Sequence, residues 1–486
     1  MKKIIFILLF FPVIGFGQPG GPGYTITVNT PSAWNGNLFF QRGGTPQKPV
    51  KIVDPIGIEI FSENWGMKGW DFKVNYNNQL SYYDRSSKGW FIMDSLQNEI
   101  DSVYAQNGYI ADNHDFLALS NGNYVLFCYD EQPYAMDTVV PGGDPNAIIE
   151  GLIIQELDPN HNVIFEWKSW DHFHITDNAY LAPWTAANLN FIHTNAIDID
   201  FDGNFIFSNR NLDEITKIHR TTGEIIWRWG GVRNEFNFIN DYPFTHQHSI
   251  RSLGNNRYLL YDNGNFSDQH IGVNLSRAVE YELDTLLMTA TKVWEFVHPD
   301  SLYTPSIGGV QRLPNGNTLI NFGNLQWLNT GSVVTEVDSN NQIVFQLEYA
   351  NGGNLYRAQK FDWFFYTPSN PTWDCIASSC IDPGTGLGSF TDSLQCVMNC
   401  VLPPDPSWNC VAGSCIDPGT GLGLFTDSLQ CVMNCNSTHF ANLEDPNPVK
   451  LIKIVDVLGQ ETPYRRNITL FYIYNDGTVE KRIVIE

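Results

Sequence analysis

The apolar and polar positions of this chain repeat one phrase. An apolar run ends at a polar residue, a short polar turn follows, and a second apolar or aromatic run begins. The six copies are "VKIVDPIGIEIFSENW", "WFIMDSLQNEIDSVYA", "IIQELDPNHNVIFEWKSW", "ITKIHRTTGEIIWRWGG", "AVEYELDTLLMTATKVWEF" and "VVTEVDSNNQIVFQLEY". Two apolar runs separated by turn residues are typical of an antiparallel hairpin. The pattern therefore predicts six hairpins.

A second phrase precedes the hairpin in four of the six units. Its copies are "HDFLALSNGNYVLF", "NAIDIDFDGNFIFS", "HSIRSLGNNRYLLY" and "GVQRLPNGNTLIN". Each combines a strand, a turn with Gly or Asn suited to positive φ, and another strand. Four strands in each of six units predict an all-β chain with a six-bladed β-propeller over residues 25–365. A β-sandwich is the alternative, but six repeats of this size fit it poorly.

Histidines occupy equivalent positions in these second phrases. Aligned on the strand after the turn, the residues ten positions earlier are His114, Asn195, His248 and Gly308. Equivalent positions in successive blades are related by rotation about the propeller axis, so His114 and His248 are expected to point at one place. His193 lies two residues before Asn195, on the same face of a strand with a period of two. We therefore predict one site that contains three histidines.

Two chemistries suit three histidines. Three imidazoles and a water can bind zinc, or the imidazoles can act on an anion as nucleophile, base and donor. Arg210 follows His193 by 17 residues and can return to the same end of that blade. A guanidinium repels a metal ion, whereas its planar fork suits sulfate or phosphate. Arg210 favours the anion, unless it is a surface residue that pairs with Asp213 or Glu214.

Several of these phrases together carry a resemblance. "HDFLALSNGNYVLF", "HTNAIDIDFDGNFIFSNRN", "TGEIIWRWGG" and "FTHQHSIRSLGNNRYLLYDNG" resemble the arylsulfotransferase family of periplasmic aryl-sulfate sulfotransferases. The resemblance implies a six-bladed propeller with a central active site and a histidine nucleophile that becomes sulfated. It implies an aryl sulfate donor, a phenolic acceptor and no phosphoadenosine cofactor. Carried over by motif, the nucleophile is His248, its catalytic partners are His193, His114 and Arg210, and Asn195 binds substrate.

Both ends of the chain carry transport signals. "MKKIIFILLFFPVIGFGQ" has the basic start, apolar middle and small-residue end of a signal peptide over residues 1–17. The last block, residues 445–486, is a run of strands that we expect to form a β-sandwich-like domain. Its "VDVLGQE", "FYIYNDGTVEKR" and "IVIE" resemble the C-terminal sorting domain of type IX secretion substrates. The resemblance implies the type IX secretion machinery as a partner and a secreted or cell-surface protein, exported through the periplasm.

The cysteines separate the propeller from this block. Eight of the nine lie between Cys375 and Cys435, in the copies "WDCIASSCIDPGTGLGSFTDSLQCVMNC" and "WNCVAGSCIDPGTGLGLFTDSLQCVMNC". In an exported chain they predict two small disulfide repeats over residues 366–436. The spacings do not match the usual zinc knuckle, so zinc is a weak alternative. Cys128, in a strand pattern, is predicted to be a buried thiol.

Charge and hydropathy exclude other classes of protein. The net charge of −24 argues against nucleic-acid binding, which needs clustered Lys and Arg. No apolar run after the signal peptide is long enough for a transmembrane segment. The sequence leaves open a non-catalytic secreted propeller that acts as a binding or adhesion module, and a metalloenzyme with three histidine ligands.

Overall fold

The computed structural model describes most of the chain. The described residues are 23–43, 49–178, 184–267, 271–325, 331–349 and 353–365, followed by 373–376, 379–381, 389–390, 393–400, 407–411, 414–417, 424–435, 451–455, 460, 462, 469–474 and 479–483. The chain divides into two compact units, Met1–Thr367 and Pro368–Glu486. The predicted signal peptide lies outside the described residues.

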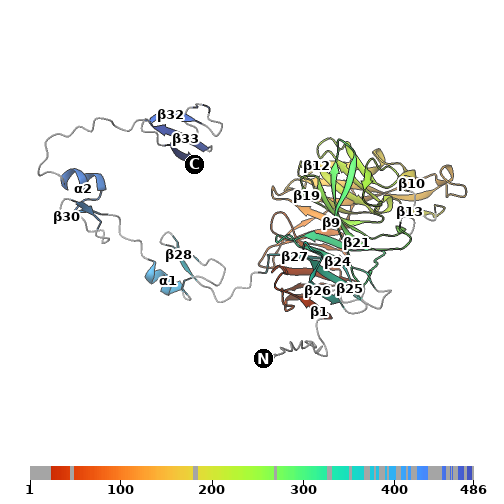
Figure 1. The fold of residues 1–486 in the computed structure, drawn as a ribbon, viewed down its shortest axis with the longest axis horizontal. Helices are drawn as coiled ribbons and strands as arrows, with labels where there is room; N and C mark the ends of the chain where they lie inside the picture. Colours follow the sequence, from red (N-terminus) through yellow and green to blue (C-terminus); the bar gives the residue numbers. More distant parts are fainter. Residues whose placement is uncertain are drawn as a thin grey trace, which may run out of the picture. The chain divides into compact units, whose positions relative to one another are not determined.

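Six mainly antiparallel sheets make up the first unit, and they confirm the predicted six-bladed propeller (Figure 1). Blade 1 contains β2 (Asn37–Gly43), β3 (Pro49–Val53), β4 (Glu59–Asn64) and, as its inner strand, β27 (Asn354–Phe361). Blade 2 contains β5 (Lys68–Val74), β6 (Leu80–Asp84), β7 (Gly89–Met93) and β8 (Glu99–Val103). Blade 3 contains β9 (Ile110–Ala118), β10 (Tyr124–Tyr134), β11 (Ala147–Leu157), β12 (Val163–Lys168) and the short β13 (Asn188–Asn190).

The other three blades follow in chain order. Blade 4 contains β14 (Thr194–Ile199), β15 (Phe205–Asn209), β16 (Glu214–Ile218) and β17 (Ile225–Gly230). Blade 5 contains β18 (Asn237–Ile239), β19 (His248–Gly254), β20 (Arg257–Asp262), β21 (Arg277–Asp284) and β22 (Thr289–Val297). Blade 6 contains β23 (Gly309–Arg312), β24 (Thr318–Phe322), β25 (Ser332–Val337), β26 (Ile343–Tyr349) and β1 (Tyr24–Asn29). Short 3₁₀ turns are η1 (Met136–Thr138), η2 (Ser169–Asp171), η3 (Ile175–Asp177) and η4 (Arg210–Leu212).

Strands from both ends of the propeller close the ring. The inner strands contact one another in the cyclic order β27, β5, β9, β14, β19, β23 and back to β27. β27 pairs with β2, and β1 pairs with β26, so blades 1 and 6 both combine early and late strands. Figure 1 shows the red N-terminal strands beside β27. This double closure removes free sheet edges that would otherwise end the ring.

The recurring Asp of the outer hairpins has a local structural role. In blade 2, Asp94 Oδ1 accepts the backbone N–H groups of Leu96 and Asn98, each at 2.9 Å. The equivalent aspartates Asp54, Asp158, Asp284 and Asp338 make the same kind of turn contact. An Asp side chain that bonds the backbone two residues ahead stabilises a tight turn. In blade 4 the ring of His219 accepts the N–H groups of Thr221 and Thr222 instead.

We expect Asp94→Ala to lower the free energy of unfolding by about 1 kcal/mol, because two turn N–H groups lose their acceptor. Asp94→Asn should lose less, since its amide oxygen can still accept. Urea denaturation of both variants checks this, and equal losses would contradict the turn-capping role.

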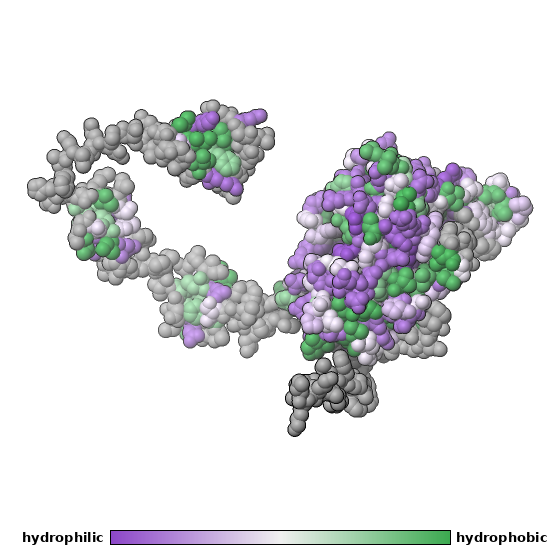
Figure 2. All heavy atoms as spheres, in the orientation of Figure 1, coloured by the Kyte–Doolittle hydropathy of each residue, from purple (hydrophilic) through white to green (hydrophobic). Residues whose placement is uncertain are grey.

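Hydrophobic side chains pack between neighbouring blades. The buried indole of Trp90 stacks on Phe116 of blade 3, and the buried indole of Trp167 meets Phe207 of blade 4 edge to face. On the face of this unit that Figure 2 shows, hydrophilic residues predominate and hydrophobic ones are scattered. Cys128 lies on β10 and is a buried free thiol, as predicted.

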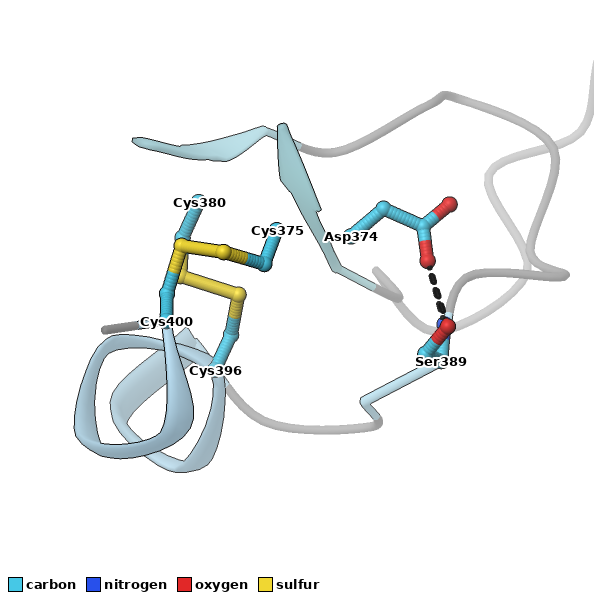
Figure 3. The surroundings of a disulfide bond; sticks show 6 residues. All are labelled: Asp374, Cys375, Cys380, Ser389, Cys396 and Cys400. Atoms are coloured by element: carbon cyan, nitrogen blue, oxygen red, sulfur yellow. Dashed lines mark hydrogen bonds between the residues drawn. A yellow bond between two sulfur atoms is a disulfide. The ribbon is translucent and has the colours of Figure 1, made fainter. Parts of the chain in front are cut away.

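The second unit contains the predicted disulfide repeats. Each pairs a short hairpin with a helix: β28 (Asp374–Ile376), β29 (Ser379–Ile381) and α1 (Ser393–Asn399), then β30 (Asn409–Val411), β31 (Ser414–Ile416) and α2 (Ser428–Cys435). The disulfides join Cys375 to Cys400 and Cys380 to Cys396, and in the second copy Cys410 to Cys435 and Cys415 to Cys431. Figure 3 shows both bonds of the first repeat attaching its hairpin to α1. All eight cysteines are therefore structural.

The C-terminal block forms a small sheet. β32 (Leu451–Val455), β33 (Thr469–Tyr474) and β34 (Val479–Ile483) pair antiparallel in that order. A second layer, which a sandwich needs, is not found among the described residues of this block, and the "NDG" turn lies outside them. In the described parts of both units, no helix has the length and apolar character to span a membrane.

Candidate functional site

Bulges at equivalent places in the inner strands shape the site. β9 pairs with β10 through Phe116 and Ala111, and residues 112–115 leave the ladder between them. β14 is irregular at Asn195, and β19 shifts register between His248 and Arg251. A bulge bends a strand and redirects its side chains. His114 and Asn195 thus lie in bulges, His193 precedes β14 and His248 flanks an irregularity of β19, so simple strand alternation between His193 and Asn195 does not describe the local backbone.

His114 and His193 lie against each other. Their ring centroids are 4.7 Å apart in an edge-to-face arrangement. His114 Nδ1 is 2.7 Å from Asp112 Oδ1, which also accepts the His114 backbone N–H at 2.8 Å. His193 precedes β14 with a φ of 49°, and its Nδ1 is 3.2 Å from the amide nitrogen of Asn190. Neighbouring blades therefore present two imidazoles to one place.

His248 begins β19 and is 4% exposed. Its Nδ1 is 2.6 Å from Asn263 Oδ1. The Asn263 amide nitrogen donates to the carbonyl oxygens of Thr304 and Ile307, at 2.9 and 2.8 Å. Because both amide protons have acceptors, the amide oxygen must face His248. The neutral His248 ring therefore carries its proton on Nδ1 and has a lone pair on Nε2.

Arg210 lies beside His193. Its backbone N–H donates to the His193 carbonyl at 3.1 Å. Its guanidinium donates to Asn211 Oδ1 at 2.9 Å and to the Pro305 carbonyl at 3.2 Å. Asp213 and Glu214, which the sequence suggested as alternative partners of Arg210, contact other residues. Asp213 lies 2.8 Å from the His246 ring, and Glu214 bonds Arg228. Within the described residues no carboxylate forms an ion pair with Arg210, so its charge can serve an anion.

Asn195 is fully buried and connects two blades. Its amide nitrogen donates to the carbonyl of Gln247, the residue before His248, at 2.8 Å. Its Oδ1 has no hydrogen-bond partner among the described residues. Its own carbonyl accepts from Arg357 Nη2 at 2.7 Å. The structure thus places Asn195 next to the backbone that holds His248.

Nearby charges act on the imidazoles. Burial lowers the pKa of His193 well below its usual value, and the charges of His114, Arg210 and His248 lower it further. Burial also lowers the pKa of His248 well below its usual value, and the charge of Arg210 is the second largest cause. The hydrogen bond to Asn263 opposes the shift. These mutual effects place the four predicted residues within electrostatic range of one another. Both rings are neutral at pH 7.

An ionic layer lies beneath the histidines. Asp115 is fully buried and contacts the cations of Lys73, Arg251 and Arg357, from β5, β19 and β27. Arg357 also bonds Asp71 at 2.9 Å, and Asp71 is 2.8 Å from Lys73. This network joins the inner strands of blades 1, 2, 3 and 5 at the axis. Arg357 also donates to the Asn195 carbonyl, so the network is linked directly to the site.

A cavity of about 370 Å³ lies three residues further along the inner strands. Leu117, Asp198 and Arg251 line it, and each follows its site residue on β9, β14 or β19 by three positions. The cavity is therefore displaced from the three histidines along the inner strands.

The histidines are not gathered as metal ligands. Among the described residues, the group of three close ligand atoms is Cys380, Cys396 and Cys400, and all three sulfurs are in disulfides. The donor set at the axis instead combines three imidazoles with a guanidinium that forms no ion pair with a carboxylate in the described part of the chain. That set suits an oxyanion.

Several residues of the site were missed in the sequence. Asp112 in "ADNHDF" and Asn263 in "YDNGNF" bond the rings of His114 and His248. Tyr356 of β27 donates from its hydroxyl to the His114 carbonyl at 2.8 Å. Asp112 could have been noticed two residues before a predicted histidine. Asn263 and Tyr356 follow only from strand pairing.

Comparisons with known proteins were made for the whole chain. A protein of unknown function from Bacteroides caccae matches at 13% identity and TM-score 0.39, over 65% of this chain and 94% of that one. A streptogramin B lyase matches at 8% identity and TM-score 0.35, over 70% and 98%. A catalytically inactive virginiamycin B lyase from Staphylococcus aureus, solved with quinupristin, matches at 9% and 0.32, over 67% and 88%. These values are too low to carry an argument, and no curated protein matches.

A family model gives the decisive match. It is described as arylsulfotransferase (ASST), and it matches residues 59–357, more than half of the chain. The matched residues span β4 to the inner strand β27 and include His114, His193, Arg210 and His248. The chain therefore belongs to the arylsulfotransferase (ASST) family.

Proposed function

We propose that this protein is an aryl-sulfate sulfotransferase that moves a sulfuryl group from a phenolic sulfate ester to a phenol through a sulfohistidine. The observation that carries the proposal is the neutral, buried His248 beside a guanidinium that has no carboxylate partner among the described residues. The reaction needs no phosphoadenosine cofactor, because the ester is itself the donor.

His248 Nε2 is the proposed nucleophile. Asn263 holds the ring proton on Nδ1, so the Nε2 lone pair attacks sulfur and the adduct ring becomes cationic. A carboxylate in place of Asn263 would stabilise that cation and slow its decay. A neutral amide orients the ring and leaves the sulfuryl group reactive. The partner of His248 therefore suits an intermediate that must form and then transfer its group.

Arg210 and His193 are the proposed donors to the sulfuryl oxygens, and Asn195 is a proposed substrate-binding residue. Arg210 offers two-pronged donation to its oxygens. His193 stays neutral at pH 7 because its pKa is lowered. Its Nδ1 faces the Asn190 amide nitrogen, so Nε2 carries a proton and can donate. Donors aimed at developing charge in a buried site are the largest single contribution in many enzymes. One of the remaining imidazoles must also handle the phenolic proton.

Nitrophenol release tests the proposal. The purified full chain is incubated with 4-nitrophenyl sulfate, with and without added phenol. We expect release that depends on phenol, and intact-protein mass spectrometry should find one SO₃ on the enzyme when phenol is left out. A folded protein that neither releases nitrophenol nor gains the label would overturn the proposal in favour of a binding module.

Arg210→Gln should lower kcat/KM for sulfuryl transfer by about 10²- to 10³-fold, as loss of one oxyanion donor does in other enzymes. Arg210→Lys should recover only part of this, because an ammonium cannot donate from a planar fork. Steady-state kinetics with 4-nitrophenyl sulfate measures both variants. Arg233→Gln, which removes a half-exposed guanidinium bonded to Asp177, is the matched control and should leave kcat/KM nearly unchanged.

We also propose that residues 1–17 direct export and that residues 445–486 engage the type IX secretion machinery. This rests on the sequence resemblance of the terminal block. In a host with that machinery, the full chain should reach the medium or the cell surface. A chain ending at residue 444 should stay in the periplasm, and equal secretion of both would contradict the assignment.

A further inference from the structure

We propose that Asp112 is a positioning residue that makes His114 the acid–base group of the transfer, an inference that rests on the function proposed above. The three site histidines differ in what faces Nδ1. His248 faces an amide oxygen, His193 faces an amide nitrogen, and only His114 faces a carboxylate. This difference assigns a separate task to each ring.

The Asp112 contact fixes the orientation and proton of His114. One carboxylate oxygen accepts both the backbone N–H, at 2.8 Å, and ring Nδ1, at 2.7 Å. The Asp112 side chain is 7% exposed. An ionised carboxylate only accepts hydrogen bonds, so the His114 Nδ1 proton stays in place. Proton gain and loss therefore occur at Nε2.

His193 is unsuited to this task. Its Nδ1 lies beside the Asn190 amide nitrogen, which also donates to the carboxylate of Glu150. A proton on His193 Nδ1 would point at the N–H of the Asn190 amide, so this contact disfavours protonation of Nδ1. Burial and the charges of His114, Arg210, His248 and His246 all disfavour a second proton on His193. It remains a neutral donor.

Groups from several strands surround His114. Asp112 lies on its own strand, Glu150 on β11, His193 before β14 and Tyr356 on β27. Burial, followed by Asp112 and Glu131, raises the pKa of Glu150 to about 7, while His114 opposes that shift. Two carboxyl groups thus share this side of the site with one imidazole.

The proposed transfer has two halves, and each half forms one bond to sulfur and breaks another. His248 Nε2 bonds to sulfur while the ester S–O bond breaks, and the electron pair of that bond goes to the bridging oxygen. This oxygen takes the proton from His114 Nε2 and leaves as a phenol. In the second half, His114 Nε2 takes the proton of the acceptor phenol, whose oxygen bonds to sulfur. The S–N bond then breaks, and its electron pair returns to His248 Nε2.

The acidity of the leaving phenol tests this assignment. Phenyl sulfate releases a phenol with a pKa of about 10, which needs a proton as it leaves. The nitrophenol of 4-nitrophenyl sulfate is far more acidic and can leave as the anion. We expect Asp112→Asn to slow histidine labelling by phenyl sulfate by about 10²-fold or more, the usual size of acid catalysis. Labelling by 4-nitrophenyl sulfate should slow by a much smaller factor.

The structure offers a matched control. His246 is paired with Asp213 in the same way, through its backbone N–H and a ring Nδ1 contact of 2.8 Å. Because His246 has no proton-transfer role in this scheme, Asp213→Asn should change the labelling rates with phenyl sulfate and with 4-nitrophenyl sulfate by the same factor. His114→Gln should reproduce the donor-selective loss, which keeps the inference testable if Asp112→Asn fails to fold.

Two results would overturn the inference. One is an equal slowing of both donors by folded Asp112→Asn, which would mark a merely structural role. The other is donor selectivity in Asp213→Asn, which would assign the task to His246. Failure of the proposed function looks different, because the wild-type chain would then be labelled by neither donor.

Discussion

His248→Ala is expected to reduce sulfuryl transfer from 4-nitrophenyl sulfate to phenol by about 10⁴-fold or more. Removal of a covalent nucleophile eliminates the two-step route altogether, and only binding and charge stabilisation remain. His248 is buried, its neutral ring has the lone pair on Nε2, and its Nδ1 faces a neutral amide rather than a carboxylate. Stopped-flow release of nitrophenol and mass spectrometry of the SO₃ adduct both measure the loss.

His161→Ala is the matched control for this variant. His161 lies on an outer turn of blade 3, where its Nε2 is 3.0 Å from Asp101. It should retain wild-type rates and the adduct. If folded His248→Ala still formed a stoichiometric SO₃ adduct, the nucleophile would be another residue, and the role proposed for Asn263 would be wrong.

Asp115→Ala should lower the free energy of unfolding by about 3–5 kcal/mol, the usual cost of removing one partner from a buried ionic cluster. Asp115 contacts Lys73, Arg251 and Arg357, and its Oδ2 accepts the backbone N–H of Ile197 at 3.1 Å. Without Asp115, Arg251 loses its carboxylate contact, and Lys73 and Arg357 keep only Asp71. Denaturant unfolding followed by fluorescence measures the change.

The same residue predicts how stability depends on pH. Burial by itself would raise the pKa of Asp115, but Arg357, Lys73 and Arg251 outweigh it and hold this pKa well below the usual range. A lowered folded pKa stabilises the protein above the unfolded pKa of about 4. This contribution declines as the pH falls below that value towards the folded pKa. Asp115→Asn should therefore flatten the acid limb of the stability curve.

Asp84→Asn is the control for the pH experiment. Asp84 also has a lowered pKa, but it lies at the end of β6, accepts from the Ser86 backbone and the Ser87 hydroxyl, and forms no ion pair within the described residues. Its loss should change the acid limb much less. An acid limb that is unchanged in Asp115→Asn would contradict a stabilising charge at the axis.

The repeating pattern of the sequence determined the blades. Every outer hairpin was visible as an apolar run, a turn and a second run, because its two strands are neighbours in the chain and the turn needs residues such as Asp94. The inner pairs of blades 3 to 6 were visible for the same reason. In blade 1 the inner strand β27 pairs with β2 from the other end of the propeller. No local phrase can contain such a pair.

The sequence also predicted residues of the candidate site. His114, Asn195 and His248 were found by repeat alignment, since rotation about an axis brings equivalent positions together. His193 and Arg210 followed from spacing and from the family resemblance. Their chemical types limited the ligand to a metal or an oxyanion before any contact was known.

Only the tertiary structure decided what each residue can do. Asn263 and Asp112 set the protons on His248 and His114, and Asp213 and Glu214 contact His246 and Arg228. Bulges redirect the site residues away from simple strand alternation. The protonation and free charge of a side chain depend on its neighbours within a few ångströms. At the axis of a closed ring those neighbours come from different blades, and local sequence does not encode their distances.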